Sequence, residues 1–254
     1  MTTATLRRSG SGQIGTVAVL LAAAAGAWVL TADRMEGMDM GPGGELGTLG
    51  WFAVTWLVMM TAMMLPAVAP VATAYSRRAA SAGGTAGFAA GYLAPWVASG
   101  LVAYAAIEAV QAIDLEFLAW DDAGRYVAAG TILGAGLYQL TPLKAGLLRR
   151  CRELDGFVRE HWRPGIAGAL QMGARYGGIC IGCCWALMAA LFALGVMSLT
   201  WMVVIAALIV AERILPFDAR VGVAVVLLAL GAGVALAPED VPGLTIPSAG
   251  MEMH

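Results

Sequence analysis

The fold is decided by the stretch Trp56-Leu57-Val58-Met59-Met60-Thr61-Ala62-Met63-Met64-Leu65-Pro66-Ala67-Val68-Ala69-Pro70. It lies in a segment that carries no charge between Glu45 and Arg77. At about 1.5 Å of rise per residue, a helix over such a run is long enough to cross the hydrocarbon core of a membrane. The stretch therefore predicts a membrane-spanning helix from about Leu49 to Ser76.

Four methionines in this stretch form what we call the Met stripe: Met59, Met60, Met63 and Met64. On a helix, Met59 and Met63 share one face, while Met60 and Met64 share the adjoining face. A thioether is a soft, uncharged ligand that suits Cu(I), and it is also a flexible apolar filler. Taken alone, the Met stripe is compatible with a copper site and with ordinary packing.

The composition of the whole chain points to the same class of protein. Of its 254 residues, 60% are hydrophobic and only 13% are charged, which is too apolar for a soluble domain. No basic stripe alternates with aromatic residues, so nucleic acid is not expected as a partner. We expect an all-α, polytopic helical bundle in a lipid bilayer, forming a single membrane domain over residues 1–254.

The hydropathy pattern predicts about seven transmembrane helices. Their expected ranges are 9–32, 49–76, 86–110, 125–143, 165–194, 199–213 and 220–237. If Arg7 and Arg8 are cytoplasmic, seven crossings leave only Arg34 and Arg125 among the loop cations outside, which satisfies the positive-inside rule. The N-terminus is then cytoplasmic and the C-terminus external. Segment 144–164 reads as a cytoplasmic basic amphipathic helix lying along the membrane, or as an ordinary basic loop.

Two segments on the predicted external side contain methionines that core packing does not explain. The Gly- and acid-rich loop at 33–48 contains Met35, Met38 and Met40, and the tail at 238–254 ends in Met251, Met253 and His254. Carboxylates concentrate a cation and sulfurs select a soft one. These residues are therefore predicted metal ligands, and a random polar loop is the alternative.

Three of the four cysteines fall on one helix face. Cys180, Cys183 and Cys184 stand at i, i+3 and i+4 in the run Gly165–Leu194. Such spacing suits a shared metal better than a relaxed disulfide, and thiolates bind Cu(I) or zinc strongly. Free cysteine is also a small hydrophobe that packs well in helices. Arg175, one turn earlier, is expected to reach toward the cytoplasmic surface.

Three stretches together resemble a bacterial family of predicted metal-binding integral membrane proteins that carry a domain of unknown function. The stretches are the Met stripe with Leu65-Pro66, the element Tyr138-Gln139-Leu140-Thr141-Pro142-Leu143-Lys144, and Cys180-x-Gly182-Cys183-Cys184-Trp185 with Gly195-Val196-Met197 and Trp201-Met202 following. The resemblance implies a bacterial inner membrane location and makes the Met stripe and the three helical cysteines the candidate ligands.

The chain departs from that family at one point. A further cysteine often follows the Thr-Pro-Leu-Lys element, but Leu147 and Leu148 occupy that region here. A second cytoplasmic thiol pair is accordingly not expected, so Cys151 is interpreted as a lone thiol or as a residue without a role, and Gln139, Thr141 and Lys144 are expected to have a structural role.

The combined pattern predicts a protein that binds a soft transition metal, copper(I) first and zinc second, and translocates or transfers it through Met and Cys ligands. Its expected partners are a periplasmic or cytoplasmic metal chaperone or metalloenzyme, and an enzymatic activity is not expected. An intramembrane thiol oxidoreductase using Cys180 and Cys183 is the first alternative. A non-catalytic membrane scaffold is the second. No Gly-rich nucleotide loop with a lysine is present, so transport driven directly by ATP is not indicated.

Overall fold

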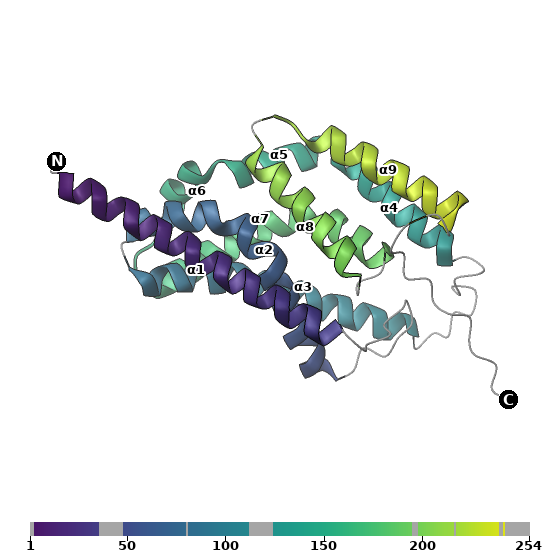
Figure 1. The fold of residues 1–254 in the computed structure, drawn as a ribbon, viewed down its shortest axis with the longest axis horizontal. Helices are drawn as coiled ribbons and strands as arrows, with labels where there is room; N and C mark the ends of the chain where they lie inside the picture. The colour runs from purple at the N-terminus through teal and green to yellow at the C-terminus, as the bar shows by residue number, and fades with distance from the viewer. Residues whose placement is uncertain are drawn as a thin grey trace.

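The computed structural model describes residues 3–35, 48–79, 81–111, 124–194, 198–215, 217–238 and 241. Over these residues every regular element is helical (Figure 1). The helices are α1 Thr3–Met35, α2 Leu49–Ala79, α3 Ala82–Gln111, α4 Arg125–Gln139, α5 Pro142–Arg152, α6 Leu154–Glu160, α7 Gly165–Leu194, α8 Leu199–Ile214 and α9 Arg220–Leu236. The predicted all-α class is confirmed.

Among the residues that the structure describes, four helical segments are long and apolar enough to cross a membrane: Ile14–Arg34, Leu49–Ala79, Gly83–Ala109 and Gly165–Leu194. They make the chain a multi-pass membrane protein. The remaining three predicted spans correspond to α4, α8 and α9, which have 15, 16 and 17 residues. Seven crossings, and the orientation built on them, stay predictions.

Helix α2 packs against α1, α3, α6 and α8, and α1 runs along it in Figure 1. It continues through Pro66 and Pro70 without interruption. Met60, Met63 and Met64 have no exposed surface, and Met59 is 4% exposed. The Met stripe therefore faces the protein interior, and its sulfurs are not in contact with lipid.

Helices α3 and α7 pack along each other so closely that only glycine fits between them. A Cβ added at Gly173 would collide with the carbonyl oxygen of Phe88 and would lie 2.7 Å from the amide nitrogen of Tyr92. At Gly177 it would lie 2.6 Å from the carbonyl oxygen of Tyr92. Small residues allow such backbone contact between membrane helices, and here they hold α7 in a fixed register against α3.

Several predicted boundaries are wrong in detail. Helix α1 begins at Thr3 instead of Ser9, and it ends at Met35 instead of Ala32. Helix α3 begins at Ala82, within the expected linker. The fourth helix ends at Gln139 instead of Leu143, because Thr141 caps a new helix, α5, with its side chain accepting a bond from the Lys144 amide at 3.2 Å.

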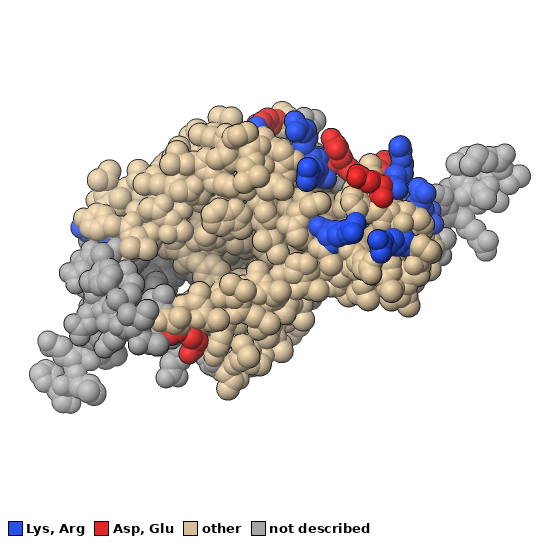
Figure 2. Space-filling view, turned by 180° about the vertical axis from the view of Figure 1, so that it is seen from behind, with Lys and Arg blue, Asp and Glu red and all other residues tan. Residues whose placement is uncertain are grey.

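The predicted basic segment 144–164 contains most of α5 and all of α6. Figure 2 shows Lys and Arg gathered toward one end of the visible face, with a largely uncharged surface beyond them. Comparison with Figure 1 places this end near α6 and the N-terminus.

Candidate metal centre

Four cysteines from two helices form a buried group that we call the thiol cluster. Helix α7 contributes Cys180, Cys183 and Cys184, and α5 contributes Cys151. Each is at most 2% exposed, and all four are free thiols. Cys180, Cys183 and Cys184 share the buried face of α7, and one guanidinium, that of Arg213, contacts the sulfurs of Cys151, Cys180 and Cys184.

The expectation that Cys151 is a lone thiol is therefore wrong. The sequence suggested isolation because leucines stand at 147 and 148. Helix α5, however, turns its buried face, which contains Leu148 and Cys151, toward the bundle. The partner of Cys151 comes from α7, which is distant in sequence.

Arg213, near the end of α8, reaches into the thiol cluster. Its Nη2 lies 2.7 Å from the Sγ of Cys180, 3.7 Å from that of Cys151 and 3.9 Å from that of Cys184. The other terminal nitrogen, Nη1, lies 3.3 Å from the Tyr176 hydroxyl. One guanidinium thus touches sulfurs from both α5 and α7.

Two buried tyrosines surround the same sulfurs. The hydroxyl of Tyr92 on α3 lies 3.0 Å from the Sγ of Cys180. The hydroxyl of Tyr176 donates to the carbonyl oxygen of Cys151 at 2.9 Å. These rings fix the cluster to α3 and to the end of α5, and they provide polar groups where lipid would provide none.

A buried ion pair stands beside the cluster. Lys144 Nζ lies 2.6 Å from Glu212 Oε2, and the two side chains are 0% and 1% exposed. The same ammonium donates to the carbonyl oxygen of Cys183 at 2.8 Å. The pair joins α5, α7 and α8 at the level of the thiols. This contact supports the structural role expected for Lys144.

The Met stripe lies on a different helix from the thiols. Helix α2 does not run along α7, but α3 and α8 each pack against both. Arg213 bridges them, because its Nη1 also lies 3.4 Å from the carbonyl oxygen of Ala67, four residues beyond Met63. A second bridge is the stacking of Trp56 on Phe192, with ring centroids 5.6 Å apart.

Within the described ranges, no three His, Cys, Asp or Glu side chains are arranged to hold one ion together. The thiols are close neighbours with a guanidinium among them, and they do not form a ready three-ligand cage. A pair of sulfurs is enough for Cu(I), whereas structural zinc takes four tetrahedral ligands.

The predicted ligands of the loop and the tail lie outside the described part of the chain. They are Met38, Met40, Met251, Met253 and His254, together with the side chain of Met35. Their role stays a prediction.

Sequence reasoning did not find the arginine that contacts the cysteines. Arg175 is exposed on α7, in keeping with a side chain that reaches the surface. The contact comes from Arg213, and next to it Glu212 is buried. One sequence signal could have identified Arg213: Glu212 and Arg213 are adjacent charges at the end of a run that carries no other charge from Leu199 onward.

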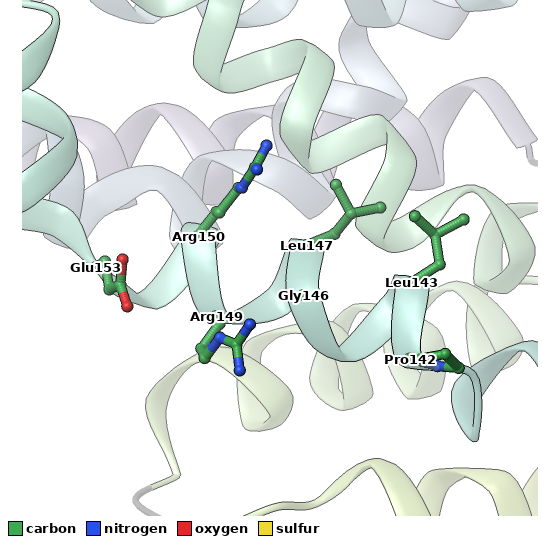
Figure 3. A pocket seen from close by; sticks show the side chains of 7 residues that line it. All are labelled: Pro142, Leu143, Gly146, Leu147, Arg149, Arg150 and Glu153. Atoms are coloured by element: carbon green, nitrogen blue, oxygen red, sulfur yellow. The ribbon is translucent and has the colours of Figure 1, made fainter.

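A shallow surface pocket of about 410 Å³ lies along α5 (Figure 3). Its lining residues are Pro142, Leu143, Gly146, Leu147, Arg149, Arg150 and Glu153. No thiol is among them, and Lys144, Leu148 and Cys151 form the separate buried face of α5. This pocket is distinct from the thiol cluster.

Comparison with known proteins gives one match. No curated protein and no solved structure matches the chain. A family model described as copper chaperone, PpoB2, matches residues 53–236, which contain the Met stripe, the thiol cluster and Arg213. Because the match covers more than half of the 254 residues, the chain belongs to the PpoB2 family of copper chaperones.

Proposed function

We propose that this protein is a membrane-embedded copper chaperone that binds Cu(I) at the thiol cluster. The observation that carries the proposal is the meeting of three free, buried thiols, Cys151 from α5 and Cys180 and Cys184 from α7, around one guanidinium. The family, with its chaperone description, supports copper as the cargo and a role without catalysis.

The chemistry of the donor set favours Cu(I) over zinc. Thiolates are soft ligands, and Cu(I) accepts as few as two of them, so a pair such as Cys180 and Cys184 on adjoining turns of α7 is sufficient. A structural zinc site would need four tetrahedral donors.

The Met stripe is proposed as a weaker site on the path to or from the thiols. Its sulfurs are buried in α2, and Arg213 contacts the same helix at Ala67. Thioethers are neutral ligands, so they bind Cu(I) reversibly and release it to thiolates. Met35, Met38, Met40, Met251, Met253 and His254 are proposed to collect the ion at the outer face of a bacterial inner membrane.

The direct test is copper stoichiometry. Full-length protein in detergent is loaded with Cu(I) anaerobically, in competition with a chromogenic Cu(I) chelator. C180S, C183S, C184S and C151S are compared with A186S. This control also places a serine hydroxyl in a buried position, here on α7, but removes no thiol. We expect the cysteine variants to lose tight binding and A186S to keep it; equal copper in all five would refute the thiol site.

A second experiment addresses the Met stripe. M63L and M64L preserve an apolar side chain of similar volume, so stability changes little. We expect slower Cu(I) loading of the thiols with nearly unchanged affinity at equilibrium. M172L, at a buried methionine on α7 that is not part of the Met stripe, is the matched control. Loading rates identical to wild type would remove the Met stripe from the path.

A further inference from the structure

The environment of Arg213 raises a question that thiol ligation alone does not answer. A cation already stands within 3.9 Å of three sulfurs of a cluster that would bind another cation. It cannot be removed by deprotonation, since a guanidinium stays charged in proteins. It is also tied in place, through Tyr176 and the carbonyl oxygen of Ala67.

The nearby charges do not cancel this one. Lys144 and Glu212 pair with each other at 2.6 Å and contribute no net charge. Arg152 donates to the carbonyl oxygen of Glu212 and not to a sulfur. The guanidinium is therefore the fixed counter-charge of the thiol cluster.

We propose that Arg213 determines which ions the thiol cluster accepts, restricting it to soft monovalent cations such as Cu(I) and disfavouring divalent ones such as Zn(II). The inference rests on the proposed Cu(I) site and adds the residue that sets its charge selectivity. Two thiolates and one guanidinium carry a net charge of minus one. A monovalent ion brings that charge to zero, whereas a divalent ion leaves an uncompensated positive charge in a buried site, which is strongly unfavourable.

The size of the effect follows from Coulomb's law. A divalent ion carries one more unit of positive charge than a monovalent ion does, and the guanidinium repels that additional unit. At a separation of about 4 Å and an effective dielectric constant near 20, that unit changes a binding constant by roughly 10²- to 10³-fold. Removing the charge should therefore shift the ratio of Cu(I) to Zn(II) affinity by at least tenfold toward zinc.

The experiment measures both affinities on the full chain in detergent, using competing chelators for Cu(I) and for Zn(II) under reducing conditions. R213M and R213Q remove the charge, and R213Q keeps a donor toward Tyr176 and Ala67. R213K keeps the charge with a different shape. R175M removes an exposed arginine of α7 and is the matched control.

We expect the affinity ratio to move toward zinc by at least tenfold in the neutral variant that folds, and to stay near wild type in R213K and R175M. A merely structural role of Arg213 would weaken both ions together and leave the ratio unchanged, and that result would overturn the inference. The inference would also be overturned if R213K shifted the ratio of Cu(I) to Zn(II) affinity toward zinc as much as R213Q does. Wild-type protein that binds no Cu(I) would refute the proposed function itself, so the two failures are distinguishable.

Discussion

Replacing Lys144 by methionine should destabilise the protein more than almost any other single change on α5. Lys144 and Glu212 are joined at 2.6 Å with 0% and 1% of their side chains exposed. Glu212 Oε1 already has no hydrogen-bond partner. In K144M, the whole carboxylate would be buried without a counter-charge, and the Cys183 carbonyl would lose its donor.

The expected loss is about 3–5 kcal/mol in the free energy of unfolding, the range for removing one partner of a buried pair. E212M should lose a similar amount. The double variant K144M/E212M should recover most of it, because an apolar pair of similar volume in place of a buried ion pair is often neutral or stabilising. The two losses are therefore strongly non-additive.

The free energies are obtained by denaturant titration of the purified protein in detergent micelles, followed by circular dichroism. The matched control is the exposed pair of Arg77 and Asp155, 3.2 Å apart with 48% and 81% of the side chains exposed. D155N should change stability by about 1 kcal/mol or less. If K144M changes stability no more than D155N, or the double variant is the sum of the single ones, the buried pair does not have the energetic role described.

Three further substitutions test other contacts. G173A should destabilise the protein and separate α3 from α7, because the added Cβ would collide with the backbone of α3. G178A has open space around the added Cβ and should be neutral, so it is the control. Thermal unfolding in detergent compares the two variants, and equal melting temperatures would contradict the close packing. Y92F removes the hydroxyl that touches a cluster sulfur and should weaken Cu(I) binding about 3- to 10-fold in chelator competition, with unchanged affinity contradicting the contact. W56F loses a 2.7 Å indole bond to a backbone carbonyl of α3 and should lower stability by roughly 1 kcal/mol or more, measured by denaturant titration; a stability equal to wild type would show that the bond is unimportant.

The sequence was sufficient for the parts of the fold that depend on local hydrophobicity. The uncharged run around the Met stripe predicts a long buried helix, and α2 is one. The spacing of Cys180, Cys183 and Cys184 predicts one shared face, and all three are buried on α7. Both results follow from the helical period of a single segment.

The sequence was not sufficient for contacts between distant segments. Cys151 joins the cluster from α5, and Arg213 enters it from α8, because of how three helices pack. Helix periodicity contains no information on which neighbour a side chain meets. The break at Thr141 was missed for a different reason: Leu140 to Leu143 is short and apolar, so hydropathy does not separate the end of α4 from a capped new helix.

If copper binds at the thiol cluster as proposed, the complete enclosure of the sulfurs constrains its transfer to an acceptor. Since none of the four thiols is more than 2% exposed, an acceptor's ligands cannot attack the bound ion while the bundle is closed. Delivery from the proposed site would then require the helix packing around the thiol cluster to open. The hand-over rate would then level off at high acceptor concentration, with its ceiling set by how often the helices part.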